Sequence, residues 1–168
     1  KGDSLKQQME LISAENTGWE FHVVGEEDPV DPEWILNDVN SYKFSASTEH
    51  SKPHTALHAL MSNKKTYWAA KVKNSEQWWQ VETKEPMLFS KLKFTGAPHG
   101  NSYMELFDLI FSMDGTTWQT IQNIEGISNG LDIKEITFEE AFSARFIRIN
   151  PIKFIGWPGF RIDFFAKK

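Results

Sequence analysis

The sequence has no cysteine, so no disulfide stabilises the fold and no thiol is available as a nucleophile. A chain of 168 residues favours a single domain. At this length a chain buries roughly 70% of its unfolded surface without a crosslink. Secreted vertebrate domains usually carry disulfides. Their absence here, like that of an Asn-X-Ser/Thr glycosylation sequon, favours either an intracellular protein or a bacterial or protist surface protein.

Positive charge is also scarce, with 18 Lys and Arg against 23 Asp and Glu and a net charge of −5. This balance argues against nucleic acid as a partner and against anionic membranes. No apolar run reaches the roughly 18 residues that a membrane span needs. The sequence also lacks a nucleophile elbow, a zinc-protease motif and a phosphate-binding loop, so we expect no enzyme activity.

Aromatic residues, in contrast, make up 14% of the chain and include seven Trp, which suits a β-rich core. Short segments with period-two alternation predict antiparallel strands without intervening helices, and hence a sandwich or barrel. Ile147 and Ile149, for example, are expected on the same face of one strand. The predicted strands are Lys43–Ser47, Trp78–Glu82, Lys91–Thr95, Leu106–Ser112, Trp118–Gln122, Ile133–Phe138, Arg145–Pro151 and Phe160–Phe165.

The first part of the chain has a different pattern. Ser4–Gln7 matches a helix capping box, and apolar residues then follow at helical spacing, which predicts one short N-terminal helix. Trp19–Val24 reads as a further strand, followed by an acidic, solvent-facing turn at Glu26–Asp28. We therefore expect residues 1–41 to form an extension that packs on, or precedes, an all-β domain over residues 42–168.

Four motifs occur in order over the second part. They are Phe44-Ser-Ala-Ser47; Trp68-Ala-Ala with Trp78-Trp-Gln-Val-Glu82; Phe111-Ser-Met-Asp-Gly-Thr-Thr-Trp118; and Ala144-Arg-Phe-Ile-Arg-Ile149 with Phe160-Arg-Ile-Asp163. In this order they resemble the discoidin family, also called coagulation factor 5/8 type C domains, a galactose-binding-like group that includes carbohydrate-binding modules. The resemblance covers roughly Tyr42 to Ala166 and leaves the extension outside it.

The resemblance implies an antiparallel, jelly-roll-like β-sandwich that is not an enzyme. Members of the family bind glycans, phospholipid head groups or proteins through loops at one end. Here those loops are expected at Ser47–Thr55, Ala70–Glu76, Gly96–Tyr103 and Lys153–Pro158. We expect Trp68, Trp78 and Trp118 in the core, and Arg161 and Asp163 as a structural pair on the last strand.

Two apolar residues stand out in the Gly- and Pro-rich segment Lys153–Gly159. Phe154 and Trp157 either form a stacking platform for a sugar or partner protein, or plug the end of the sandwich. His50 and His54, with His58, have a spacing that suits zinc on a helix, but Pro53 breaks any helix there. We therefore expect no metal, and interpret His50 and His54 as contacts to ligand hydroxyls or as solvated loop residues.

The loop that begins at Gly96 supplies further polar candidates. The predicted ligand-binding residues are His50, His54, His99, Asn101, Tyr103, Phe154 and Trp157. Sugar-binding relatives often carry an Arg near the start of this loop, where this chain has Gly96 and Ala97. Many relatives also hold a structural calcium with an Asp-Gly pair and a later Glu. This chain has Leu60–Asn63 and Asp163 instead, so we expect no cofactor.

The function we favour is a non-catalytic carbohydrate-binding module, located extracellularly or at a cell surface such as a bacterial envelope. The alternative is a protein-interaction or adhesion domain, which the missing Arg and the apolar segment around Trp157 support. Docking to a phospholipid surface is a third reading. Lysines in the predicted loops favour docking to phospholipids, whereas the acidic net charge of the chain argues against such docking.

Overall fold

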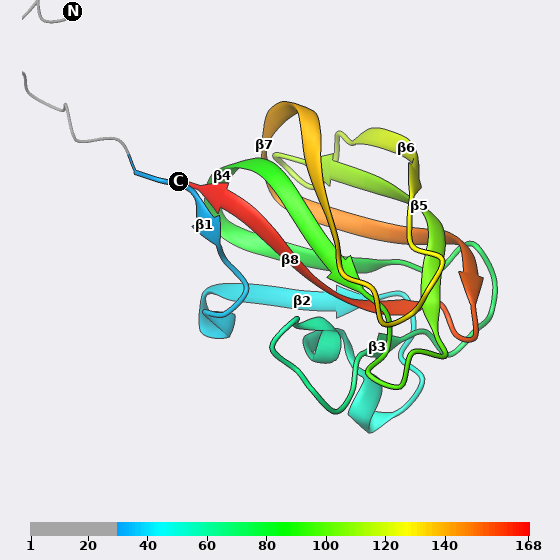
Figure 1. Cartoon of the computed structure of the whole chain (residues 1–168). Coiled ribbons are helices and arrows are strands. Elements are labelled where there is room, and N and C mark those ends of the chain that lie inside the picture. The colour runs from blue at the N-terminus through cyan, green and yellow to red at the C-terminus, as the bar shows by residue number, and fades with distance from the viewer. Residues whose placement is uncertain (1–29) are drawn as a thin grey trace, which may run out of the picture. The chain divides into compact units, whose positions relative to one another are not determined.

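The computed structural model describes residues 30–168, and the predicted helix at Ser4–Gln7 and strand at Trp19–Val24 lie outside them. Asp31–Lys168 form one compact, mostly antiparallel unit (Figure 1). Its elements, in chain order, are β1 (Glu33–Trp34), the 3-10 helix η1 (Val39–Ser41), β2 (Tyr42–Ala46), η2 (Lys52–His54), η3 (Ala56–Ala59), β3 (Trp68–Ala69), β4 (Trp79–Thr95), β5 (Tyr103–Ser112), β6 (Gln119–Glu125), β7 (Lys134–Ile155) and β8 (Gly159–Lys167).

Two long strands join the layers of a β-sandwich. The first part of β4 pairs with β2 and the second part of β7, and that part of β7 also pairs with β5, which pairs with β6. The second part of β4 pairs with β8 and with the first part of β7. Four strands that the sequence predicted separately, two in β4 and two in β7, are therefore halves of continuous strands that pass from one layer to the other (Figure 1).

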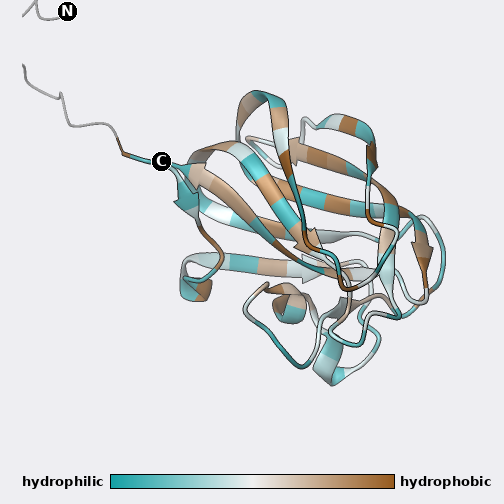
Figure 2. Ribbon diagram, in the orientation of Figure 1, coloured by the Kyte–Doolittle hydropathy of each residue, from teal (hydrophilic) through white to brown (hydrophobic). Residues whose placement is uncertain are grey.

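The phase of the apolar residues changes partway along β4. In β4, Met87 and Phe89 are buried, and the pattern then shifts by one residue to Leu92 and Phe94. The register with both neighbouring strands breaks at the same point, between Phe89 and Lys91. An extra residue lets the strand bend while each half keeps its apolar face on the core. Figure 2 shows the resulting alternation of apolar and polar residues along the strands.

The core is aromatic and lies between the layers. Trp79 is fully buried, its ring lies 5.5 Å from that of Phe160, and its Nε1–H donates to the carbonyl of Ala56 at 2.8 Å. Ile147 and Ile149 are both buried from one face of β7, as predicted. Trp68 is also fully buried, which confirms its expected core position.

The core prediction was wrong for Trp78 and Trp118, which are only half-buried. Both lie against the guanidinium of Arg148, at 4.2 Å and 4.5 Å from its Cζ to the ring centroids. Trp78 precedes the buried Trp79 by one residue, so the alternation of a strand directs it to the other face. The two indoles thus hold an arginine on the outer surface of the sheet instead of filling the core.

The expected pairing of Arg161 with Asp163 was also wrong, although both residues are buried on β8. Arg161 donates from Nε to the carbonyl of Gly96 and from a terminal nitrogen to that of Asn63. Asp163 Oδ1 accepts the backbone N–H of Leu36 at 2.9 Å, while burial raises the pKa of its carboxyl group. Each charge is satisfied by backbone groups of segments that cross β8, which fixes those segments on the sandwich.

Candidate functional site

The connections at one end of the sandwich surround a cavity of about 420 Å³, which we call the loop-end pocket. It combines residues from the segment after β2, the β4–β5 connection and the β7–β8 turn. The lining residues are His50, His54, Tyr67, His99, Asn101, Ser102, Gly156 and Trp157. Part of the wall is exposed, including His50, His99 and Asn101, whereas Tyr67 and Ser102 are buried.

The β7–β8 turn depends on a glycine. Gly156 has a φ of +73°, and a Cβ there would lie 2.4 Å from the carbonyl oxygen of Asn101 and 2.5 Å from Ser102 Oγ. The turn therefore lies directly on the β4–β5 connection. The backbone N–H of Trp157 also donates to Ser102 Oγ at 3.2 Å. These contacts fix the half-buried indole at the edge of the pocket.

Aromatic rings follow one another around the wall. His50 meets Trp157 edge-on, with 4.4 Å between ring centroids, and lies 5.5 Å from His54. Tyr67 is then 5.0 Å from His54 and 5.7 Å from His99. Burial raises the pKa of Tyr67, so its hydroxyl stays protonated. These contacts among side chains from different loops give the pocket a defined wall.

Hydrogen bonds within the wall orient two of the imidazoles. His54 Nδ1 lies 3.0 Å from the carbonyl oxygen of Tyr67, which can only accept, so Nδ1 carries a proton. In the neutral ring, Nε2 is then an acceptor. His99 Nδ1 accepts the backbone N–H of Asn101 at 3.0 Å, which leaves its proton on Nε2 as a donor. In their neutral forms, His54 thus keeps an acceptor at Nε2 and His99 keeps a donor at Nε2.

The wall contains no carboxylate and no arginine. A lysine does approach it, because Lys73 Nζ lies 4.4 Å from the centroid of the Trp157 ring. Lys73 is exposed, so a ligand that stacks on this indole can displace the ammonium group into solvent. The pocket is therefore aromatic and polar but not acidic, in a chain whose net charge is −5.

Five of the seven predicted ligand-binding residues line this pocket, namely His50, His54, His99, Asn101 and Trp157. The other two do not. Tyr103 and Phe154 lie in the ladder between β5 and β7, where Tyr103 pairs with Ile155 and Phe154 with Met104, and both are half-buried.

Sequence reasoning missed Tyr67, Ser102 and Gly156. Tyr67 directly precedes the Trp68-Ala-Ala motif, outside the predicted loops, and no signal in the sequence shows that it faces the histidines. Ser102 and Gly156 lie inside predicted loops, and their contact across the two loops appears only in the fold.

Asn63 lies in the segment where the resemblance would place a calcium ligand, and both of its oxygens accept hydrogen bonds. The main-chain oxygen of Asn63 accepts from the Arg161 guanidinium, and its side-chain oxygen accepts the N–H groups of Lys65 and Thr66. These donors occupy oxygens that a calcium ion would need. Within residues 30–168, no group of three or more His, Cys, Asp or Glu is placed to hold a metal, and no helix is long and apolar enough to cross a membrane.

Known proteins resemble this chain in both sequence and fold. The non-catalytic subunit of the venom prothrombin activator omicarin-C from Oxyuranus microlepidotus is 27% identical over 103 residues, which is 55% of this chain and 7% of that relative. The chain thus spans a small part of that protein.

Among solved structures, discoidin II from Dictyostelium discoideum matches with a TM-score of 0.76 and 16% identity, over 83% of this chain and 60% of that one. A family 32 carbohydrate-binding module of NanJ from C. perfringens, solved in complex with galactose, matches with a TM-score of 0.67 and 18% identity, over 80% and 98% of the two chains.

The family model of the F5/8 type C domain matches residues 43–161, which is most of the chain. The match includes the first three ordered motifs and ends at Arg161, inside the last part of the fourth. The sandwich with its loops at one end agrees with that match. The chain therefore belongs to the F5/8 type C domain family.

Proposed function

We propose that this domain is a non-catalytic carbohydrate-binding module that takes a sugar in the loop-end pocket. The main support is the arrangement at His54 and His99, which keep one acceptor and one donor in a pocket that the Trp157 indole also lines. A sugar hydroxyl both donates and accepts, and the C–H face of a pyranose packs on an aromatic ring. The galactose complex of the similar family 32 module supports the same ligand class.

The binding is expected to be weak for a single sugar. The pocket is open, and most of its polar groups are already in water, so the net gain of each hydrogen bond is about 1 kcal/mol. A neutral sugar fits better than a cationic one because Lys73 lies over the indole. An extracellular or cell-surface location, without a bound cofactor, belongs to this proposal.

A glycan array with the whole chain and the variant Trp157→Ala tests the proposal. Trp34→Ala is a matched control, because Trp34 is also a half-buried indole with a lysine, Lys93, 4.2 Å from its ring centroid. We expect glycan binding that Trp157→Ala abolishes and Trp34→Ala retains. A blank array, or equal loss in both variants, would contradict a sugar site at Trp157.

A protein partner is the second candidate, and one observation favours it. Leu57, Val72 and Ile155 are 48%, 43% and 43% exposed, and they belong to segments that carry the pocket residues or Lys73. Exposed apolar residues around a pocket are typical of an interface for another protein. Retention of a partner by wild type but not by Leu57→Ser/Ile155→Ser, together with a blank glycan array, would favour this function.

A further inference from the structure

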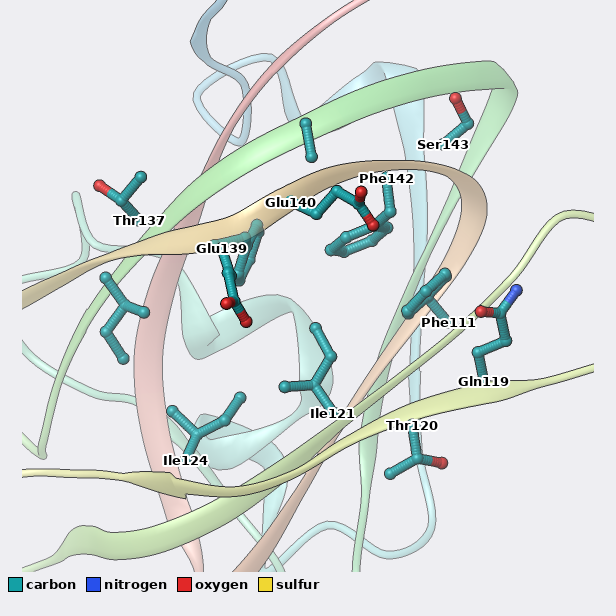
Figure 3. Close-up of a pocket in the computed structure, with 13 residues that line it drawn as sticks. Phe111, Gln119, Thr120, Ile121, Ile124, Thr137, Glu139, Glu140, Phe142 and Ser143 are labelled. Carbon is teal, nitrogen blue, oxygen red and sulfur yellow. The ribbon is translucent and has the colours of Figure 1, made fainter.

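A second cavity, which we call the edge cleft, lies at the open side of the sandwich between the two layers (Figure 3). Its volume is about 530 Å³, within the roughly 300–1,000 Å³ typical of ligand sites. β6 and the end of β5 form one wall, and the first half of β7 forms the other. None of its lining residues belongs to the loop-end pocket, so it is a separate site.

The interior of the edge cleft is apolar and preformed. Phe142 stacks on Phe111 with 4.0 Å between ring centroids, and Phe138 lies 5.0 Å from Phe142. Ile121 and Ile124 face these rings from β6 (Figure 3). Phe111, Phe142 and the two isoleucines are only half-buried, so apolar surface remains available to a ligand.

The charges on the cleft are all negative. Glu139 and Glu140 are exposed members of the wall, and Figure 3 shows their carboxylates beside the apolar side chains. No Lys, Arg or His lines the cleft. Lys134, at the start of the same strand, already donates to the carbonyls of Glu125 and Gly126 at 2.9 and 3.1 Å. An occupant that combines apolar groups with positive charge is therefore complementary to this cleft.

Both walls also carry backbone that lies outside the paired ladders between strands. β4 pairs Lys91 with Thr137 and Phe89 with Phe142, so residues 138–141 bulge out of that ladder. β6 is the last strand of its layer and pairs only with β5 within residues 30–168. Free N–H and C=O groups along strand edges are a template for an added extended segment. A small organic cation would leave them unused.

We propose that the edge cleft binds an extended peptide segment of a partner protein in which apolar residues alternate with Lys or Arg. In such a segment, side chains alternate between faces. The apolar ones meet the Phe111–Phe142 stack, and the basic ones meet Glu139 and Glu140. This site operates independently of any sugar in the loop-end pocket, so the domain has two ligands of different chemistry.

The test is a titration of the isotopically labelled whole chain with an acetylated, amidated peptide Val-Lys-Val-Lys-Val-Lys, followed by amide chemical shifts. We expect saturable shifts in β6 and residues 138–142, and no comparable shifts with the matched peptide Val-Glu-Val-Glu-Val-Glu. Reversing the charges in Glu139→Lys/Glu140→Lys is expected to weaken binding about tenfold or more. The control Glu85→Lys/Glu105→Lys makes the same change in net charge at exposed residues outside the cleft and is expected to leave binding within about twofold.

Several outcomes would overturn the proposal. These are an absence of saturable shifts, equal binding of the acidic peptide, or equal weakening in both charge variants, which would indicate non-specific attraction. Butylamine that reproduces the same shifts with equal affinity would also overturn it, because the cleft would then bind a small cation without using strand edges. Loss of glycan binding has no bearing on this result, since the peptide titration contains no sugar.

Discussion

Replacing Gly156 by Ala should disturb both stability and ligand binding. Its φ of +73° costs an L-residue roughly 1–2 kcal/mol. The added Cβ would also lie 2.4 Å from a backbone oxygen of Asn101, and relief of such a contact costs about 1–3 kcal/mol. The total loss is about 2–5 kcal/mol. At roughly 2–4 °C per kcal/mol for a chain of this size, the melting temperature should fall by about 4–20 °C.

Gly115→Ala is the matched control. Gly115 has a φ of +80°, and the atoms nearest to a Cβ there belong to the ring of Phe146, at 3.2 Å, with no backbone atom among the three nearest. It should cost about 1–2 kcal/mol from the backbone conformation alone. Chemical denaturation measures the free energy of unfolding of the Gly156→Ala and Gly115→Ala variants. Glycan binding is then measured with each variant in its folded state. Equal losses of stability in the two variants, with unchanged binding by Gly156→Ala, would refute the role assigned to the turn.

Further predictions concern the sandwich. Trp79→Phe should lower the free energy of unfolding by about 2–4 kcal/mol in guanidinium denaturation, because it leaves a void and removes the hydrogen bond to Ala56; a loss under about 0.5 kcal/mol would contradict the packing described. Arg148→Lys keeps the charge but not the planar stack between two indoles, and should cost about 1 kcal/mol in the same assay, whereas an unchanged midpoint would show that the stack adds no stability. Backbone N–H groups of the β5–β6 hairpin hold the pKa of the Asp114 carboxyl well below its usual range. The ionised carboxylate therefore stabilises the folded state at pH values above that usual range, and this stabilisation is lost as the pH falls. Asp114→Ala should therefore be less stable than wild type at pH 7, and urea unfolding should show the gap narrowing below about pH 4; a gap that widens in acid would exclude this cause.

The alternation of apolar residues was enough to predict the longer strands but not their continuity, and it missed the two-residue strands β1 and β3. The pattern marked Trp78–Glu82 and Lys91–Thr95 correctly as strand, and β4 contains nearly all of both. The residues between them look like a loop because Pro86 and charged residues interrupt the alternation. In the fold, this segment is the bend at which β4 passes from one layer to the other, a tertiary feature that no local pattern reports.

For the candidate site, too, local sequence features could be predicted but contacts between distant segments could not. The sequence could predict that His50, His54, His99 and Trp157 lie in loops at one end of the sandwich, because functional side chains are often carried on loops. Their role in binding stays a prediction. Their mutual contacts were not predictable, because His54 and His99 come from loops 45 positions apart that meet around Tyr67. The predicted core position of Trp78 and Trp118 was wrong for a related reason. Both indoles contact Arg148, which lies on a third segment of the chain, and no local pattern reports that contact.

The most direct test of the sugar-binding proposal is a titration of the isotopically labelled chain with a glycan from the array or, first, with galactose. We predict saturable amide shifts at Ser102, Gly156 and the indole N–H of Trp157, with none at Ile121 or Glu139 in the edge cleft. Saturable binding with shifts elsewhere, or no shifts with any glycan, would contradict a sugar site in the loop-end pocket.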